Sequence, residues 1–253
     1  MASAKGICRV LDWDSEFFGQ KIAQVTVNTL ESGEMKRVIA WCRAHHIRCL
    51  YFLAEADRAQ TVRLAEDNGF RLVDIRITLG KKLHQAQTVP SGTTSNVVRR
   101  CRPGDVSSLR AIARASHRDS RFYYDSNFPR SLCDHLYEVW IEKSCRGYAD
   151  VVFVVESRNR PAAYISCHLL GKRKGKIGLV GVAPHSRGRG LGKALISQAL
   201  RWFSQQGVRD VTVVTQGRNH RAQRLYQQLG FHSRSVQLWY HRWFKPAEEA
   251  GSG

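Results

Sequence analysis

The feature that most constrains this sequence is a turn rich in glycine and arginine between an apolar strand and an amphipathic helix. Segment 181–193 reads GVAPHSRGRGLGK and overlaps the end of a strand predicted over 176–182. A helix is predicted over 191–206, because apolar residues recur on one face until Gly207 ends it. A strand that feeds directly into a helix is typical of α/β proteins, so we expect a mixed sheet covered by helices.

The same turn has the composition of a phosphate-binding site. Backbone N–H groups in the first turn of a helix lack intrahelical partners, and the helix dipole adds partial positive charge there. Glycine lets an anion approach the backbone, and Arg187, Arg189 and Lys193 add full charges. A basic surface turn is the plainer interpretation, but three glycines with two arginines favour a diphosphate ligand. The order of residues fits neither a P-loop nor a dinucleotide-binding pattern, which disfavours nucleotide hydrolysis and a Rossmann fold.

A polar stretch without periodicity divides the chain. It predicts a first domain over 1–83, a linker over 84–96, a second domain over 97–246 and a disordered tail over 247–253. Both parts have the pattern of α/β proteins, and each carries a helix followed by Gly-Phe and a strand. The predicted strands are 48–54, 70–79, 150–156, 162–170, 176–182, 211–215 and 231–244, and the further predicted helices are 58–68 and 219–229.

Positive charge is concentrated in the second part. The 253 residues include 40 Lys and Arg against 21 Asp and Glu. Residues 1–96 hold 13 basic and 10 acidic residues, whereas residues 97–253 hold 27 and 11. The second part is therefore suited to an anionic partner, and phosphorylated small molecules, nucleic acid and acidic membrane surfaces all stay open.

The sequence also indicates a compartment. No segment approaches the roughly 18 apolar residues of a membrane helix, and the N-terminus lacks the apolar core of a secretory signal. The seven cysteines are scattered without a C-x-x-C pair, which is typical of reduced thiols. We therefore predict a cytoplasmic protein with no membrane span. No His, Cys and carboxylate cluster has zinc spacing, so we predict no metal.

Two blocks of the second part resemble a known family. The pattern Arg187-x-x-Gly190-x-Gly192 resembles the first signature of the GNAT acetyltransferase superfamily, and segment 219–231 (NHRAQRLYQQLGF) resembles its second block. The resemblance covers about residues 97–245. It implies a GNAT fold, acetyl-CoA as acyl donor, and N-acetyl transfer by direct attack of an amine on the thioester.

The resemblance also implies a binding site for acetyl-CoA. The turn after the strand would hold the pyrophosphate, the main chain of the strand would pair with the pantetheine arm, and the second block would lie near the thioester. The residues carried over are Leu179, Val180, Val182, Arg187, Gly188, Arg189, Gly190, Gly192, Lys193, Asn219 and Ala222.

Tyr226 is the candidate catalytic residue. Its helical spacing with Ala222 and Leu229 alone favours a core position. The resemblance favours instead a general acid, and a phenol with a pKa of about 10 can share a proton with a thiolate whose thiol has a pKa of about 8.5. The predicted strand 176–182 carries no carboxylate that could act as base, so the base comes from elsewhere in the chain, from a chain of water molecules, or is not needed. Candidate bases lie near the start of the domain, namely His117, Asp119, Tyr123, Tyr124 and Asp125.

A second resemblance concerns the acceptor. Segment 11–19 (LDWDSEFFG) resembles the opening of the TDP-fucosamine acetyltransferase group, whose members carry a small GNAT-like N-terminal half and acetylate a TDP-linked 4-amino-4,6-dideoxyhexose. Segment 120–129 (SRFYYDSNFP) resembles the part that lies over the acceptor there, although a loop anchored by aromatic residues fits equally well. The implied first domain is a truncated GNAT-like domain, and the implied pathway is surface polysaccharide synthesis. The candidate acceptor contacts are Arg121, Tyr123, Tyr124 and Asp125.

Two other functions stay open at this point. A GNAT domain acting on a protein or small-molecule amine is disfavoured, because a positively charged domain is a poor host for cationic acceptors. A basic nucleic-acid-binding protein with an inert coenzyme A site is disfavoured by the lack of a helix-turn-helix, RNP or zinc signature. An exposed edge of the strand 211–215 would offer the contact for a homodimer.

Overall fold

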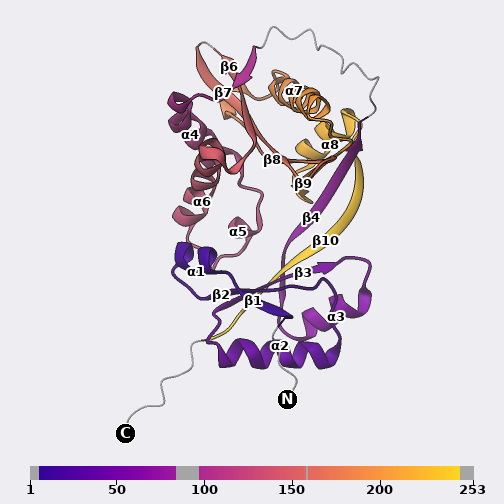
Figure 1. Ribbon diagram of the computed structural model, residues 1–253. Helices are drawn as coiled ribbons and strands as arrows, with labels where there is room; N and C mark the ends of the chain where they lie inside the picture. Colours follow the sequence, from indigo (N-terminus) through magenta and orange to yellow (C-terminus); the bar gives the residue numbers. More distant parts are fainter. Residues whose placement is uncertain (1–5, 84–96, 158, 246–253) are drawn as a thin grey trace. The chain divides into compact units, whose positions relative to one another are not determined.

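The computed structural model describes residues 6–83, 97–157 and 159–245 (Figure 1). The predicted linker 84–96 and tail 247–253 lie outside the described residues. The chain divides into two compact units. The first consists of Met1–Arg76, Tyr124–Phe128 and Val236–Gly253, and the second of Ile77–Tyr123 and Pro129–Ser235. This division differs from the predicted boundary, because the C-terminal strand and one short inner segment group with the N-terminal part.

The first unit is a sheet covered by helices. Its strands are β1 (Cys8–Val10), β2 (Ile22–Val25), β3 (Cys49–Glu55), the last residues of β10 (His232–Trp243) and the first of β4 (Arg71–Lys82), in the order β1-β2-β3-β10-β4. Its helices are α1 (Asp12–Phe18), α2 (Ser32–Ala44) and α3 (Ala59–Asp67). β3 is buried throughout its centre because its residues are almost all apolar, and it pairs antiparallel with β10 from Cys49↔Trp243 to Glu55↔Gln237.

The second unit carries the larger part of the sheet. Its strands are β5 (Val98–Arg100), β6 (Val151–Ser157), β7 (Arg160–Leu169), β8 (Lys174–Val182), β9 (Asp210–Gln216) and the remaining residues of β4 and β10. Their order is β10-β4-β9-β8-β7-β6-β5, antiparallel from β5 to β8 and parallel between β8 and β9. The fold is therefore the mixed α/β arrangement that the sequence predicts.

Helices lie on both faces of this sheet. They are α4 (Val106–Ser116), α5 (Arg121–Tyr124), α6 (Arg130–Lys143), α7 (Leu191–Gln205) and α8 (His220–Gln228), with short helical turns η1 (Pro103–Asp105), η2 (Ser144–Tyr148) and η3 (Pro184–Ser186). Figure 1 shows α4 and α6 on one side of β6–β8 and α7 on the other. Among the described residues, none of the helices has the length and apolar character needed to cross a membrane.

The sequence of α7 explains how the core of the second unit forms. Leu195, Ala199 and Phe203 recur every four residues and are fully buried against β7, β8 and β9. Each large apolar side chain buried in this way contributes roughly 1.5–3 kcal/mol. Gly175 of β8 leaves room for Phe203, since a Cβ there would lie 2.6 Å from the phenyl ring.

One expectation about assembly is wrong. The sequence predicts an exposed strand edge at 211–215. This segment instead forms the centre of β9, which lies between β4 and β8. Both edges of β9 therefore face neighbouring strands of the same unit, and they do not offer the predicted contact for a second subunit.

Candidate active site

The strands β8 and β9 separate before they end. Their parallel pairing runs from Lys174↔Asp210 to Ile177↔Val213, and no further pair joins them in the described chain, although β8 continues to Val182. On its other side β8 stays paired with β7 as far as Ala163↔Val182. The last residues of β8 thus present main-chain groups toward the gap between β8 and β9, where an extended polar ligand can pair with them.

A bulge marks the point where β8 leaves β9. The register between β7 and β8 shifts between Ile165 and Cys167, and the N–H of Leu179 donates to the Ser166 hydroxyl at 2.8 Å instead of to a backbone carbonyl. A bulge bends its strand and increases the local twist, which accounts for the separation. Leu179, Val180 and Val182 are half-buried along this segment.

The glycine-rich turn leaves its N–H groups open. Gly188 and Gly190 have φ of +79° and +76°, a region that favours glycine, and Gly190 caps α7 without any side-chain hydrogen bond. In the part of the chain that the structure describes, the N–H groups of Gly188, Arg189 and Gly190 have no acceptor, and Ala194 N–H is the one that closes onto the Gly190 carbonyl. These groups, with those of the first turn of α7, fit an anionic ligand.

The basic side chains of the turn have different surroundings. Arg189 and Lys193 are exposed, and within residues 6–83, 97–157 and 159–245 neither forms an ion pair. Arg187 is also exposed, but its Nε lies 3.4 Å from the Val182 carbonyl and its Nη2 3.2 Å from the Ala115 carbonyl. Arg187 therefore ties the turn to the end of α4 in addition to supplying charge.

Gly192 serves helix packing. A Cβ at this position would lie 2.9 Å from Cδ2 of Leu225, so the lack of a side chain allows α7 to approach α8 closely. Within the motif, the glycines at 188 and 190 shape the turn, whereas Gly192 positions the two helices that flank it.

The second block lies on α8. The Asn219 side chain accepts a hydrogen bond from Ala222 N–H at 3.0 Å and so caps the helix, and Ala222 packs against the core. Tyr226 is 5% exposed and packs on Phe231 with ring centroids 5.6 Å apart. Burial raises the pKa of Tyr226, so its hydroxyl stays protonated at neutral pH. Among the described residues the hydroxyl has no hydrogen-bond partner, which leaves its proton available to a ligand.

His117, one of the candidate bases, lies against β7. It ends α4, its Nε2 is 2.9 Å from the Tyr164 hydroxyl, and its ring stacks on Tyr137 at 4.6 Å. The Tyr164 ring covers Gly181 of β8, where a Cβ would lie 2.5 Å from Cε1. Burial lowers the pKa of His117 to about 4, so the imidazole is neutral at pH 7.

The four candidate acceptor contacts differ in burial and in the unit to which they belong. Tyr123 is buried and donates a 2.5 Å hydrogen bond to Asp134, while Arg121 lies over Phe122 with its Cζ 4.5 Å from the ring centroid. Tyr124 belongs to the first unit and is 51% exposed. Arg121 and Tyr124 are thus the more accessible of the four, and Tyr123 is engaged by the protein.

Asp125 has its partners within the first unit. It accepts hydrogen bonds from Trp243 Nε1 at 2.8 Å and Asn127, and it pairs with Nδ1 of His241 at 2.7 Å. Burial opposes ionisation here, but these hydrogen bonds outweigh it and lower the pKa of Asp125 to about 2. His241 and Trp243 are more than 100 residues away from Asp125 in the sequence, so no local pattern signals these contacts.

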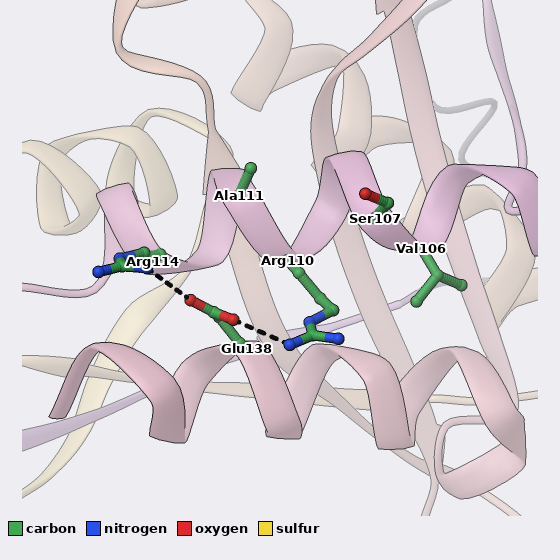
Figure 2. Close-up of a pocket in the computed structure, with 6 residues that line it drawn as sticks. All are labelled: Val106, Ser107, Arg110, Ala111, Arg114 and Glu138. Atoms are coloured by element: carbon green, nitrogen blue, oxygen red, sulfur yellow. Dashed lines mark hydrogen bonds and ion pairs between the residues drawn. The ribbon is translucent and has the colours of Figure 1, made fainter. Parts of the chain in front are cut away.

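A surface pocket lies between α4 and α6 (Figure 2). It is lined by Val106, Ser107, Arg110, Ala111, Arg114 and Glu138. Glu138 lies 3.1 Å from Arg110 and 3.5 Å from Arg114, and Glu142 and Asp134 pair with the same two arginines, so acidic groups offset both guanidinium charges. None of the predicted site residues lines this pocket, and its paired arginines do not form an anion site.

Comparison with known proteins identifies the domain that carries the turn and Tyr226. A model described as the acetyltransferase (GNAT) family matches residues 113–231, a range that includes β7–β9, the turn, α7 and α8. Residues 113–231 form a GNAT acetyltransferase domain. GNAT acetyltransferases use acetyl-CoA as acyl donor, and this GNAT domain is an acetyl-CoA-dependent N-acetyltransferase. The open N–H groups, the exposed cations and the free side of β8 fit that donor.

Relatives of the GNAT domain include proteins of carbohydrate synthesis. The chain is 28% identical over 148 residues to the spore coat polysaccharide biosynthesis protein SpsD of Bacillus subtilis, a match that covers 58% of this chain and 50% of that protein. It is 27% identical over 235 residues to the dTDP-fucosamine acetyltransferase of Escherichia coli, covering 92% and 96% of the two chains. A GCN5-related N-acetyltransferase from Sphaerobacter thermophilus superposes with a TM-score of 0.69 at 19% identity, covering 95% and 77%. The expected GNAT fold is confirmed.

Proposed function

We propose that this protein transfers the acetyl group of acetyl-CoA to the amino group of a nucleotide-linked amino-deoxy sugar of the TDP-4-amino-4,6-dideoxyhexose type, in the synthesis of a surface polysaccharide. The observation that carries the proposal is the match over 92% of the chain to a protein named dTDP-fucosamine acetyltransferase. The partial match to a spore coat polysaccharide protein supports the same class of acceptor. The excess of basic residues in the second part is compatible with two phosphorylated substrates.

The turn and the end of β8 bind the donor in this proposal. The N–H groups of Gly188, Arg189 and Gly190 and the first turn of α7 hold the diphosphate, and Arg187, Arg189 and Lys193 add charge. The main chain of Leu179, Val180 and Val182 pairs with the pantetheine arm along the side of β8 that β9 leaves. Asn219 and Ala222 position α8, which brings Tyr226 to the thioester.

Tyr226 acts as general acid. The neutral sugar amine attacks the thioester carbonyl, a C–N bond forms, the C–S bond breaks, and the leaving sulfur takes the proton of the Tyr226 hydroxyl. The amine loses one proton as the amide forms. His117 is the candidate for its acceptor, because its imidazole is neutral at pH 7 and Tyr164 fixes its orientation, although the same burial makes it a weaker base. With Nε2 donating to the Tyr164 oxygen, Nδ1 carries the free lone pair.

An assay of thiol release tests the acceptor. Purified protein is incubated with acetyl-CoA and TDP-4-amino-4,6-dideoxygalactose, and free coenzyme A and the N-acetylated sugar nucleotide are measured. The matched control is the TDP-sugar with a hydroxyl in place of the amine, which should give no turnover above hydrolysis. A lysine peptide and a polyamine serve as competing acceptors. A higher kcat/KM with either of them than with the amino sugar nucleotide would contradict the proposal.

The proposal includes a cytoplasmic location. All seven cysteines are free thiols in the structure, and thiols stay reduced mainly in reducing compartments. Fractionation of cells, with the protein detected by antibody, tests this part separately from the acceptor.

A further inference from the structure

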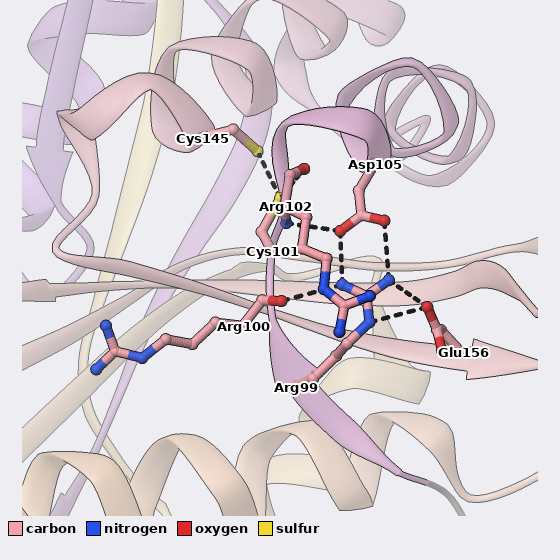
Figure 3. A network of polar contacts seen from close by, with 7 residues as sticks. All are labelled: Arg99, Arg100, Cys101, Arg102, Asp105, Cys145 and Glu156. Atoms are coloured by element: carbon pink, nitrogen blue, oxygen red, sulfur yellow. Dashed lines mark hydrogen bonds and ion pairs between the residues drawn. The ribbon is translucent and has the colours of Figure 1, made fainter.

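Two cysteines of the second unit, Cys101 before α4 and Cys145 after α6, lie side by side. Cys101 directly follows β5, and Cys145 lies in η2 after α6. Their Sγ atoms are 3.7 Å apart, although the residues are 44 positions apart in the sequence (Figure 3). Both side chains are partly exposed, whereas the other five cysteines are buried. This pair therefore combines proximity with access to solvent.

The backbone around Cys101 is firmly held. Its N–H donates to the Val152 carbonyl at 2.8 Å, so the residue continues the pairing of β5 with β6. Arg99, two residues before Cys101, donates to both carboxyl oxygens of Asp105, at 2.7 and 2.9 Å, and also contacts Glu156. Asp105 in turn accepts from the N–H of Arg102 at 2.7 Å. These contacts keep the Cys101 thiol directed toward Cys145, as Figure 3 shows.

The surroundings favour a thiolate at Cys101. The hydrogen bond with Cys145 lowers the pKa of Cys101, and the Arg99 guanidinium adds to this effect, while burial and Asp105 oppose it. The same hydrogen bond, together with burial, raises the pKa of Cys145. Thiolate character and exposure are the two properties that decide which cysteines react with peroxide.

We propose that Cys101 and Cys145 are a peroxide-sensitive dithiol that closes to a disulfide. The Cys101 thiolate attacks one oxygen of hydrogen peroxide, an S–O bond forms, the O–O bond breaks, and the leaving hydroxide takes a proton to become water. Cys145 then attacks the Cys101 sulfenic acid, the S–S bond forms, the S–O bond breaks, and the second water leaves with the Cys145 proton. Two thiols are oxidised and one peroxide is reduced to two waters.

The geometry allows the bond with a small movement. The two sulfurs must approach by about 1.7 Å to reach the S–S length of about 2.05 Å. Regular helix geometry ends at Arg146 and Gly147, directly after Cys145, and Gly147 has φ of +103°. We expect rotation of the two side chains and a shift of this turn to close the bond while β5 and β6 keep their pairing.

The first unit contains an internal control. Cys8 and Cys42 also share a side-chain hydrogen bond, but they are only 8% and 0% exposed. If proximity alone decided oxidation, both pairs would react together. If access is also needed, the Cys101–Cys145 pair reacts first.

Mass spectrometry of the folded protein tests the proposal. Wild-type protein is treated with hydrogen peroxide, its free thiols are alkylated, and its peptides are mapped without reduction. We expect a Cys101–Cys145 cross-link, a mass lower by two hydrogens, and full reversal by dithiothreitol. We expect the Cys8–Cys42 pair to be alkylated only after unfolding. No cross-link at peroxide concentrations that leave the fold intact, or equal oxidation of both pairs, would overturn the proposal.

Three variants assign the roles. Cys145→Ser should give a sulfenic acid at Cys101 that reacts with dimedone, because the resolving thiol is gone. Cys101→Ser should give much less dimedone adduct at Cys145. Cys8→Ser should still form the Cys101–Cys145 cross-link at the wild-type rate. Preferential labelling of Cys145 over Cys101 in the matched serine variants contradicts the assignment of the attacking thiol.

Discussion

At the scale of single residues, the structure of Tyr226 is compatible with both roles that the sequence presents as alternatives, a core residue and the proposed general acid. Its ring packs on Phe231 within the core of the second unit, as helical spacing predicts. Its hydroxyl has no hydrogen-bond partner in the described chain, and burial raises its pKa, so the hydroxyl carries its proton at neutral pH. A residue can fill both roles because a tyrosine side chain has an apolar ring and a polar tip.

Tyr226→Phe separates these roles. The substitution keeps the ring contact and removes the proton, so we expect kcat to fall about 10²–10⁴-fold while the affinity for acetyl-CoA changes little. Steady-state kinetics and calorimetric titration with acetyl-CoA measure the two quantities. The thermal transition of the variant should match the wild type. An equal loss of kcat and of acetyl-CoA affinity would contradict the proposed role of Tyr226 as general acid.

His117 gives a prediction about pH and stability. Its pKa is about 4 in the folded chain against about 6.5 when unfolded, so between these values the unfolded state binds the extra proton. The contribution of the neutral imidazole is complete above pH 6.5 and is lost as the pH falls toward 4, by up to about 3 kcal/mol. Urea unfolding of the wild type and of His117→Asn at pH 7 and pH 4.5 measures it.

The variant should show less of this loss than the wild type over the same pH range. Asp125 titrates lower, since its depressed pKa of about 2 causes loss of stability only as the pH falls below its usual value near 4. Titration of Asp125 therefore changes the stability mainly below the range from pH 7 to pH 4.5 in which unfolding is measured. The same pH slope in wild type and variant would mean that His117 is not the group responsible.

At the scale of elements, the strand β8, the turn and α7 together form the candidate donor site. The bulge opposite Ser166 frees one side of β8, Gly188 and Gly190 shape the turn, and Arg187 fastens it to the end of α4. Arg187 therefore influences the position of the N–H groups as well as the charge, whereas Arg189 contributes charge alone. The two arginines, adjacent in the motif, can be told apart by mutation.

Arg187→Ala should raise the KM for acetyl-CoA about tenfold, because a charge and two hydrogen bonds to carbonyl groups are lost. Arg189→Ala should raise it by a smaller factor that shrinks further at high salt. Lys172→Ala removes an exposed charge before the opposite end of β8 and serves as the control with unchanged KM. Equal effects of Arg187→Ala and Arg189→Ala would show that charge alone matters.

Some elements can be predicted from the sequence and others cannot. The strands β3, β6, β8 and β9 and the helices α7 and α8 lie within about two residues of their predicted ends, because apolar runs or periodic faces are bounded by glycine or a capping residue. The helices α4 and α6 were not predicted. Their many charged residues obscure the apolar face and instead pair between the helices, as Arg110 does with Glu138 and Glu142.

The candidate site also has parts that can be predicted from the sequence and parts that cannot. The turn and Tyr226 are predictable because they form local motifs whose spacing is visible in one stretch of chain. The contacts of Asp125 with His241 and of His117 with Tyr164 join residues 116 and 47 positions apart, so local patterns cannot reveal them. The side-chain contacts of the candidate acceptor residues therefore became visible only with the fold.

At the scale of the whole molecule, the chain leaves and re-enters the first unit. The segment Tyr124–Phe128 belongs to that unit, and Asp125 fastens it to His241 and Trp243 of β10. The last part of β10 pairs with β3 over seven residues. A break in composition at 84–96 therefore does not coincide with a break in packing, because residues on both sides of it build the same unit.

A fragment of residues 97–253 tests this division. It lacks β3, so Tyr240 and His241, which are 0% and 1% exposed in the chain, lose the strand that covers them. It also lacks β4, the neighbour of β9 in the second unit. Burial of one large aromatic side chain contributes roughly 1.5–3 kcal/mol, and a whole domain is stable by only about 5–15 kcal/mol.

We therefore expect this fragment to show no cooperative thermal transition and to bind no acetyl-CoA, although it contains the whole matched GNAT range. Addition of a separate fragment of residues 1–83 should restore both properties, since it supplies β3 and β4 together. Calorimetry of each fragment and of their mixture measures this. A cooperative transition and acetyl-CoA binding by the fragment alone would instead favour independent domains joined at 84–96, because the strands of the first unit would then be dispensable for folding of the second.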